Sequence, residues 1–484
     1  MKKLLLFATV LLFAASTASA SVNVTDPAVY ADTLDYKFEN IWIQSKTAGG
    51  FSSVGYGLPT AFARGMAGKD GKILICSRNA ATVGGTGIDK YILKTNIFVY
   101  DGLTGNLENT IPVPDSLFHV KDAVGDTLRP ITAYPTNDIQ VDDAGNVVLM
   151  GMTLSLGTSP LVVAVLKIDL STGTITSAKK LLNNKYSELY ISTSLIRLDA
   201  FNVFGDMYGN GYIMAAVAGT NPGVGNMVIR WNIVNGKPDV VNYLPIQINK
   251  YVPLAATGNA IAPRVTPLSE TLFYLDGNAS FPTIYDMQGN LADSIPKKYK
   301  DSRGLANNGV DEFTITDGSV NRNFVVYSNH ESSTSASMSS SWTLGELGAG
   351  QSLMNMTRLY NFPKAGLGTF SNPNRTAVPY IQVVGKSAYI YVYNISNGLA
   401  AYKLTLKPTG LDKNEMSSVS VSLNANQIKI SEEVALVEVI SITGQKLISA
   451  QNVSVIDAPK TTGVYIVNIV DKNGAKKFQK ISVN

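Results

Sequence analysis

The stretch that decides the fold is AVPYIQVVGKSAYIYVYNISNGLAAYKLTL, residues 377–406, because it contains three predicted strands where a complete sheet unit needs four. An isolated segment of the same character, YKFENIWIQS at Tyr36–Ser45, lies near the other end of the chain. We expect it to supply the fourth strand, since a sheet with a bare edge gains by pairing that edge. Pairing the two ends of the chain in this way closes a ring of sheets.

The strands of this closing unit belong to a longer series. Few windows have helical spacing of apolar residues, and short apolar, β-branched runs recur between Gly, Asn and Asp clusters instead. A turn of the form Asp/Asn-x-x-(x)-Gly follows a strand at five places: Asp101–Gly105, Asp169–Gly173, Asn232–Gly236, Asp286–Gly289 and Asn394–Gly398. The distance between the last two turns is about twice the others, so we infer that the unit between them lacks this turn.

A second kind of turn, in which an acidic residue precedes glycine, introduces several of the strands. It occurs in KDGKILIC, DDAGNVVLM, DMYGNGYIM and TDGSVNRNFVV. Counting both kinds of turn predicts an all-β chain with a β-propeller of six blades, with seven as the alternative. The period exceeds the usual ~40–50 residues, which we attribute to long loops between strands.

The first twenty residues, MKKLLLFATVLLFAASTASA, have the pattern of a secretory signal peptide. The basic Lys2 and Lys3 precede an apolar run that is shorter than the roughly 20 residues needed to cross a bilayer. No cysteine follows the small-residue cleavage site, which excludes an N-terminal lipid anchor, and no later stretch is long and apolar enough to span. We therefore expect a secreted, soluble chain with no transmembrane segment.

The C-terminal part differs from the repeats in organisation. We divide the chain into a signal peptide at 1–20, a β-propeller at 21–407, a polar linker at 408–415 and a small β-sandwich at 416–484. The last segment contains four short motifs: TGQK at 443–446, VID at 455–457, TTGVYIV at 461–467 and KISV at 480–483.

These motifs resemble the type A C-terminal sorting domain of proteins exported by the type IX secretion system of Bacteroidetes. Ala458-Pro459-Lys460 departs from the family pattern, which often has Ser-Leu there. The resemblance implies that the type IX machinery is a partner, that the tail is often cleaved, and that the protein reaches the cell surface or medium. The alternative is an accessory β-sandwich such as a carbohydrate-binding module. The residues that match the sorting signal are Gly444, Gly463, Tyr465 and Lys480.

The preceding body resembles uncharacterised secreted propellers of the same bacteria, which implies no activity. The charge of the whole chain also bears on function. Its formal net charge of +4 falls to +2 when Lys2 and Lys3 are removed with the signal peptide. A nearly neutral chain gives no electrostatic reason to bind nucleic acid.

Residues for metal, cofactor or covalent chemistry are few. Cys76 is the single cysteine, so no intrachain disulfide can form, and its apolar strand KILICS predicts a buried core residue. His119 and His330 are the two histidines, which disfavours a zinc site or a Ser-His-Asp triad. We predict no metal, no cofactor and no assigned catalytic residue.

The mouth of the channel is then the expected site, since propeller ligands meet the innermost strands and the loops between blades. Asn137, Asn202 and Glu312 are further candidates by position. The alternative role for each candidate is to bridge adjacent blades. The predicted ligand-binding residues are Arg129, Asp138, Asp206, Arg264, Asp311 and Arg375.

These side chains would suit sugars or acidic groups. We predict a monomeric binding or scaffold module for a glycan or protein partner. The alternative is an enzyme acting on a polysaccharide or lactone. A glycosidase would need two carboxylates about 5–10 Å apart, and a lactonase would need a carboxylate and an Asn around Ca²⁺. The first suspects for either enzyme are Asp138, Asp206, Asp311 and Glu312.

Overall fold

The computed structural model describes most of the strands of the chain. The predicted signal peptide, the linker and Arg375 lie outside the described residues, as do the side chains of Arg129, His119 and His330. The described residues are 28–29, 35–45, 62–77, 80–82, 91–93, 95–122, 125–130, 136–151, 161–184, 197–218, 227–239, 244–248, 263–278, 280–296, 299, 305–307, 309–318, 320–331, 338–364, 366–367, 369–370, 377–394, 398–407, 419–424, 426–472 and 476–483.

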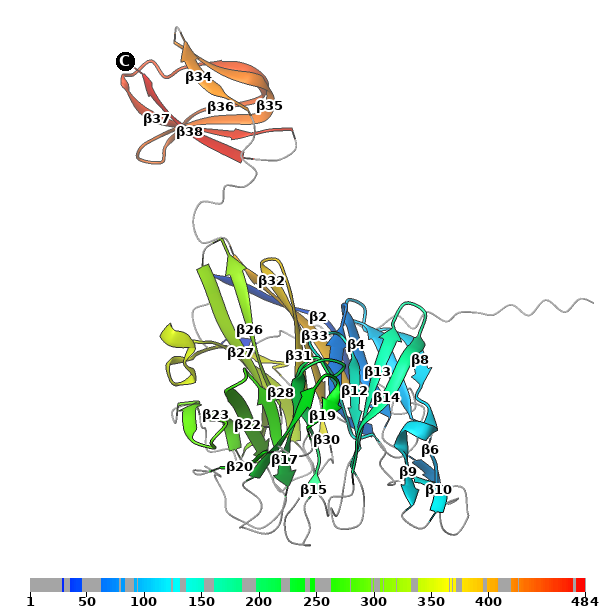
Figure 1. Cartoon of the computed structure of the whole chain (residues 1–484). Coiled ribbons are helices and arrows are strands. Elements are labelled where there is room, and N and C mark those ends of the chain that lie inside the picture. Colours follow the sequence, from blue (N-terminus) through cyan, green and yellow to red (C-terminus); the bar gives the residue numbers. More distant parts are fainter. Residues whose placement is uncertain are drawn as a thin grey trace, which may run out of the picture. The chain divides into compact units, whose positions relative to one another are not determined.

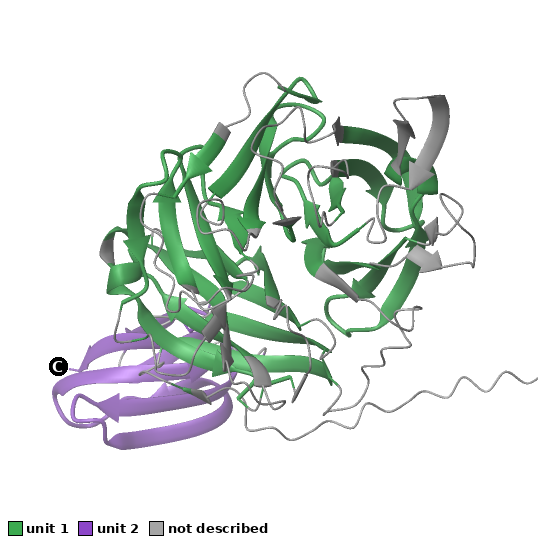
Figure 2. Cartoon of the chain, turned by 90° about the horizontal axis from the view of Figure 1, so that it is seen from below, with its two compact units in different colours: residues 1–406 green, residues 407–484 purple. Residues whose placement is uncertain are grey.

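Six antiparallel sheets form a ring in the first unit, residues 1–406 (Figure 2). We number these blades in chain order and give the strands of each from the channel outward. Blade 1 is β3 (Phe62–Lys69), β4 (Lys72–Ser77), β7 (Asn96–Asp101) and β8 (Leu107–Pro112). Blade 2 is β11 (Asp138–Val141), β12 (Val147–Met150), β13 (Leu161–Asp169) and β14 (Thr174–Asn184). Blade 3 is β16 (Asn202–Gly205) with β15 (Arg197–Leu198), then β17 (Gly211–Ala218), β18 (Met227–Val234), and β19 (Lys237–Pro238) with β20 (Leu244–Gln247).

The other three blades complete the ring. Blade 4 is β21 (Arg264–Pro267), β22 (Leu272–Asn278), β23 (Ser280–Asp286) and β24 (Leu291–Ser294). Blade 5 is β26 (Val310–Asp317), β27 (Val320–Glu331), β28 (Met338–Glu346) and β29 (Thr357–Phe362), with β1 (Ala28–Val29) paired to β29. Blade 6 is β31 (Ala377–Val384), β32 (Ser387–Asn394), β33 (Gly398–Leu406) and β2 (Tyr36–Ser45). The predicted propeller is confirmed, with six blades in the described residues.

Short elements decorate the ring. The strand β25 (Leu305–Asn307) pairs with β22 and β27 and so joins blades 4 and 5, and β30 (Thr369–Phe370) pairs with β28. Two hairpins, β5 (Ala80–Thr82) with β6 (Tyr91–Leu93) and β9 (His119–Asp122) with β10 (Gly125–Pro130), stand apart from the blades. The described residues include three single-turn helices, η3 (Asp115–Phe118), η6 (Ala349–Gln351) and η7 (Leu353–Asn355). Within the described residues, no helix has the length and apolarity that a membrane crossing requires.

The closure of the ring is as predicted. The strand β2 runs antiparallel to β33, with Tyr36 opposite Leu406 and Ser45 opposite Gly398. From β2, Trp42 donates its indole N–H to the carbonyl of Gly102 in blade 1 at 2.9 Å. The N-terminal strand thus completes blade 6 and links it to the first blade.

All five Asp/Asn-x-x-(x)-Gly turns follow a strand, as predicted, and the first four join the third and fourth strands of their blades. In blade 1, the Asp101 carboxylate accepts hydrogen bonds from the amides of Leu103 and Thr104, and Gly105 has φ +73°, so the turn is held by its own sequence. The turn that ends at Gly398 instead joins the second and third strands of blade 6. It lies one strand earlier because the fourth strand of that blade comes from the other end of the chain.

Apolar cores fill the spaces between neighbouring blades. One cluster packs blade 1 against blades 6 and 2, and four more lie between the pairs 2–3, 3–4, 4–5 and 5–6. Cys76 is fully buried in the first of these, and burial raises the pKa of its thiol, so its predicted place in the core is confirmed. The ring therefore depends on face-to-face packing of sheets.

The second unit, residues 407–484, has its own core. Its strands are labelled in Figure 1. Its five strands form one antiparallel sheet, and Val437, Val439 and Val467 are fully buried in it. A break in register between Lys429 and Val434 lets the long second strand bend. The strands are β34 (Val421–Asn424), β35 (Gln427–Ser441), β36 (Lys446–Asp457), β37 (Gly463–Val470) and β38 (Lys476–Val483).

The residues of the predicted sorting signal occupy different places in this unit. Gly444 has φ +86° in the turn between β35 and β36, and Gly463 begins β37. The buried Tyr465 donates its hydroxyl to the carbonyl of Thr461 at 2.7 Å, while Lys480 is exposed on β38. Their role in export stays a prediction.

Candidate ligand site in the propeller channel

A cavity of about 210 Å³ lies among the innermost strands of all six blades. Because each blade contributes one strand, residues distant in sequence meet here. The polar lining consists of Gln140, Asn202, Arg264, Thr266, Asp311 and Tyr380, and the apolar lining of Met66, Ala67, Gly68, Val141, Pro267, Val310, Val378 and Pro379.

Two predicted site residues, Asp138 and Arg264, form a buried ion pair beside this cavity. Nη2 of Arg264 lies 2.9 Å from both carboxylate oxygens of Asp138, and the side chains are 3% and 0% exposed. Asp138 also accepts hydrogen bonds from the amides of Ile139 and Phe201 at 3.0 and 3.1 Å. The carboxylate of Asp138 is therefore saturated by donors and has a structural role.

Arg264 keeps hydrogen-bonding capacity that the ion pair does not use. It lines the cavity, and its buried Nη1 has no hydrogen-bond partner within the described residues. Asp276, opposite Arg264 in the register of β21 and β22, is fully buried. Burial raises the pKa of Asp276 well above its usual value, and the nearby guanidinium opposes this. The sequence analysis did not identify Asp276. An acidic residue inside the apolar run LFYLDG is a signal that could have indicated a buried carboxyl group.

Asp311 is the carboxylate that lines the cavity. It comes from β26, and burial raises the pKa of its carboxyl to about 7. A hydrogen bond from the backbone amide of Glu312 opposes this increase, and the charge of Glu312 adds a smaller one. Glu312 instead accepts a hydrogen bond from the hydroxyl of Tyr274 in blade 4. Consecutive strand residues point to opposite sides, so the two acids do not act on one ligand.

Tyr380 forms an aromatic wall that the sequence analysis did not single out. Its ring stacks on Tyr391 with centroids 5.7 Å apart, and burial raises the pKa of its hydroxyl to about 12. A Cβ at Gly68 would lie 1.8 Å from a ring carbon of Tyr380. Gly68 is thus required because the ring packs directly on its backbone. Tyr380 is one strand tyrosine among many, so composition alone could not identify it.

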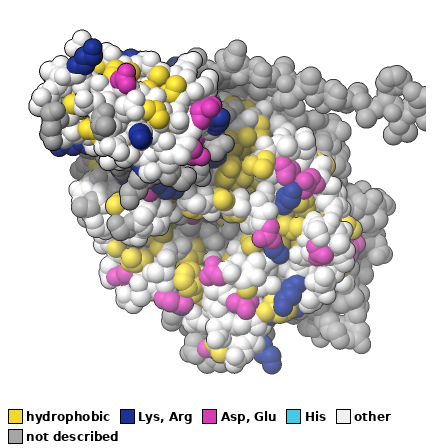
Figure 3. Space-filling view, turned by 90° about the horizontal axis from the view of Figure 1, so that it is seen from above, with side chains coloured by type: hydrophobic (Ala, Val, Ile, Leu, Met, Phe, Trp, Pro, Cys, Tyr) yellow, Lys and Arg dark blue, Asp and Glu magenta, His cyan; other side chains and the backbone are white. Residues whose placement is uncertain are grey.

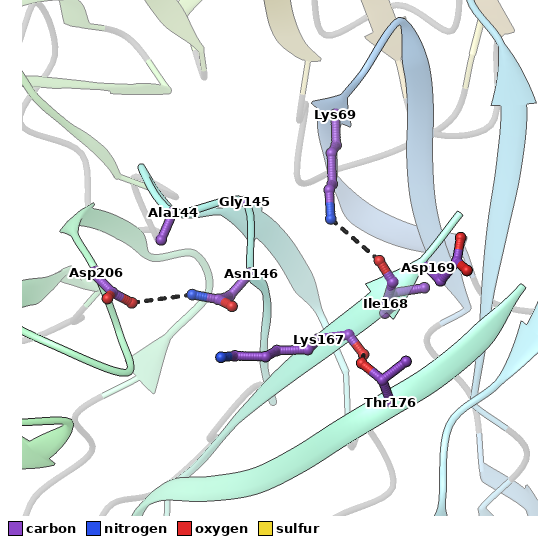
Figure 4. Close-up of a pocket in the computed structure, with 9 residues that line it drawn as sticks. All are labelled: Lys69, Ala144, Gly145, Asn146, Lys167, Ile168, Asp169, Thr176 and Asp206. Atoms are coloured by element: carbon purple, nitrogen blue, oxygen red, sulfur yellow. Dashed lines mark hydrogen bonds between the residues drawn. The ribbon is translucent and has the colours of Figure 1, made fainter. Parts of the chain in front are cut away.

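The structure places Asp206 outside the channel lining. It belongs to the turn after β16, where Oδ1 accepts hydrogen bonds from Asn146 Nδ2 at 3.1 Å and from the amide of Tyr208 at 2.8 Å (Figure 4). Asn146 also donates to Asp142 Oδ2 at 2.8 Å. Asp206 therefore bridges blades 3 and 2, which was the alternative role considered for it.

The described channel does not contain the arrangement expected of a glycosidase. Of the four suspected acids, Asp138 is held by Arg264, Asp206 and Glu312 point elsewhere, and only Asp311 lines the cavity. In the described part of the chain, no group of three or more His, Cys, Asp or Glu side chains is placed to hold a metal ion. On the face drawn in Figure 3, basic and acidic side chains are interspersed, without a large field of one sign.

Fold and cavity together define a six-bladed β-propeller with a small polar cavity in its channel. No protein-family model and no curated protein sequence matches the chain. Solved structures that resemble it include a glucose dehydrogenase (10% identity, TM-score 0.35, 77% of this chain and 100% of the other). They also include a Trypanosoma rangeli sialidase (9%, 0.34, 87% and 83%) and an exo-1,5-alpha-L-arabinanase from a bovine ruminal metagenomic library (9%, 0.32, 73% and 95%).

At such identities the likeness concerns the fold alone.

Proposed function

We propose that the propeller binds a single sugar residue of a glycan in its channel. The observation that carries this proposal is the cavity, which every blade lines and which presents hydroxyl, amide, guanidinium and carboxyl groups together. Sugar hydroxyls both donate and accept hydrogen bonds, and this mixture of groups offers both. Tyr380 adds an aromatic side chain with a polar hydroxyl to this lining.

The size of the cavity limits the ligand. Pockets for drug-sized ligands measure about 300–1,000 Å³, and the channel cavity of about 210 Å³ is smaller. One ring or a small polar molecule fits this volume, whereas several linked sugars do not. We therefore expect recognition of a chain end or a monosaccharide.

Calorimetric titration of the full chain with a panel of monosaccharides and short oligosaccharides tests this proposal. We expect one sugar class to bind, and Asp311→Ala to abolish that binding. Glu312→Gln is the matched control, because this neighbouring acid faces blade 4. Absence of binding across the panel, or equal loss in both variants, would overturn the channel site.

A second candidate function is glycan cleavage, and the protonation of Asp311 favours it. A carboxyl with a pKa of about 7 is partly protonated at neutral pH, as a general acid must be. Release of reducing ends from a polysaccharide by the full chain, lost in Asp311→Asn, would establish an enzyme. Sugar binding without release of reducing ends would contradict the enzymatic function and support a binding module.

We also propose that the second unit directs export across the outer membrane to the cell surface or medium. The motifs around Gly444, Gly463, Tyr465 and Lys480 support this, and so does a separate core that lets the unit fold whatever precedes it. In the original host, deletion of 416–484 should leave a folded propeller in the periplasm, and a carrier fused to 408–484 should be exported. Surface display of the truncated protein would refute this assignment.

A further inference from the structure

A second pocket, of about 320 Å³, lies where blades 1, 2 and 3 meet (Figure 4). It is distinct from the channel cavity, although the two are neighbours on β3, where Gly68 lines the channel cavity and Lys69 lines this pocket. Its lining comes from the end of β3, the turn after β11, the facing ends of β13 and β14, and the turn after β16. These residues are Lys69, Ala144, Gly145, Asn146, Lys167, Ile168, Asp169, Thr176 and Asp206.

The ammonium groups of Lys69 and Lys167, both in this lining, have N–H groups available for a ligand. Lys69 Nζ donates to the carbonyl of Ile168 at 3.2 Å, which uses one of its three protons. Lys167 is exposed, and its Nζ lies 4.3 Å from the centroid of the Tyr208 ring. A cation over a ring is attracted to the π-face but leaves its N–H groups free for other acceptors. Both side chains can therefore reach a ligand in the pocket.

The carboxylates of the pocket do not neutralise these lysines. Asp206 is engaged by Asn146 and by the amide of Tyr208. Asp169 accepts hydrogen bonds from the amide and hydroxyl of Ser171 at 2.9 and 2.6 Å, and its carboxylate points away from Lys167 in Figure 4. Among the ion pairs of the described residues, none joins Lys69 or Lys167 to an acid.

A third lysine adds to the positive charge. Lys179 Nζ lies 4.1 Å from the centroid of the same Tyr208 ring and donates to the carbonyl of Gly236 at 2.8 Å. Burial lowers the pKa of Lys179, and the charge of Lys167 lowers it further, while Asp206 and Asp142 oppose this. Two cations are thus held over one ring, an arrangement that an anion nearby would stabilise.

We propose that this pocket binds the anionic group of an acidic sugar, a carboxylate or sulfate, between Lys69 and Lys167. Charge-assisted hydrogen bonds from ammonium groups are the usual way to hold such a group. Asn146, Thr176 and Asp206 provide amide, hydroxyl and carboxylate groups for the sugar hydroxyls. The proposal does not depend on the channel site.

Titration of the full chain with four probes tests the class of ligand: D-glucuronate, D-glucose 6-sulfate, D-glucose and inorganic sulfate. We expect one or both charged sugars to bind at least about tenfold more tightly than glucose, because a charge-assisted hydrogen bond supplies that difference. The two charged sugars separate a carboxylate site from a sulfate site. Binding should weaken as salt is raised.

Substitutions of the pocket lysines test whether the charged sugar binds in this pocket. The double variant Lys69→Gln, Lys167→Gln should bind the charged sugar at least about tenfold more weakly than the wild type. If the double variant folds poorly, Lys167→Gln alone is used to test the same effect. The matched control is Lys403→Gln, since Lys403 lies over the Tyr389 ring in blade 6. Equal affinity for glucose and the charged sugars, equal binding of inorganic sulfate, or equal loss in the control would overturn the proposal. Charged-sugar binding lost in Asp311→Ala but kept in the lysine variants would assign it to the channel, overturning this inference while leaving the proposed function standing.

Discussion

The guanidinium of Arg264 in blade 4 holds the carboxylate of Asp138 in blade 2, with Nη2 at 2.9 Å from both oxygens. The two blades are not neighbours. Blade 3 stands between them, and the amide of Phe201, just before β16, donates to the same carboxylate at 3.1 Å. A single buried carboxylate thus ties together three successive blades at the channel.

Replacing Asp138 by alanine should destabilise the propeller by roughly 3–5 kcal/mol, because removal of one partner leaves a buried charge uncompensated. Urea denaturation of the full chain, followed by tryptophan fluorescence, measures this change in the free energy of unfolding. The control is Lys37→Ala, which breaks an exposed pair with Glu39 and should cost only about 0–1 kcal/mol. Similar costs for the two variants would show that the central pair contributes no more than a surface one.

The N-terminal strand offers a separate test, of ring closure. The ring of Phe38 in β2 lies 4.7 Å from that of Tyr360, 5.0 Å from Phe362 and 5.4 Å from Tyr402, between centroids. Phe38→Ala should cost about 3–5 kcal/mol, the range for large-to-small changes at buried aromatic residues. The measurement is the shift in urea midpoint, with Lys37→Ala again as the neighbour on the same strand. An unchanged midpoint would mean that β2 does not hold the ring closed.

Local patterns explain why the ring was predictable. The turn beginning at Asp101 is stabilised by its own side chain, and β2 has the apolar pattern of a strand that lacks a nearby partner. Such features depend on neighbours in sequence. The turn at Gly398 was predicted as a turn, but its place in the blade depended on a strand more than three hundred residues away and could not be read locally.

The site was predictable only in part. The sequence points to Asp138, Arg264 and Asp311 because they lie near the starts of predicted strands, and these starts do converge on the channel. Which acid pairs with Arg264 depends on packing between blades, which no local pattern encodes. Tyr380 is distinguished only by its packing against Gly68.

The contact between Gly68 and Tyr380 leads to a third prediction. Gly68→Ala should destabilise the protein by about 1–3 kcal/mol, the usual cost of overpacking, and should weaken ligand binding in the channel by displacing the ring. Tyr380→Ala should remove the clash, so the two substitutions together should cost less than the sum of their separate effects. Urea denaturation of both single variants and the double variant measures this coupling. Additive costs would show that the two residues do not pack against each other.

Asp311 leads to the last prediction, on pH. Burial raises the pKa of its carboxyl from 3.8 to about 7, with Glu312 beside it and Tyr380 nearby in blade 6. Between these two pH values the folded state binds the proton more tightly than the unfolded state, so this group lowers the free energy of unfolding as pH rises. Asp311→Asn removes the titration, and the variant should gain stability relative to the wild type from pH 4 to pH 8, by on the order of 4 kcal/mol. Urea midpoints at a series of pH values measure the difference between the two proteins, in which the other titrating groups cancel. A constant difference would show that Asp311 titrates alike in the folded and unfolded states, and it would also remove the support for Asp311 as a general acid.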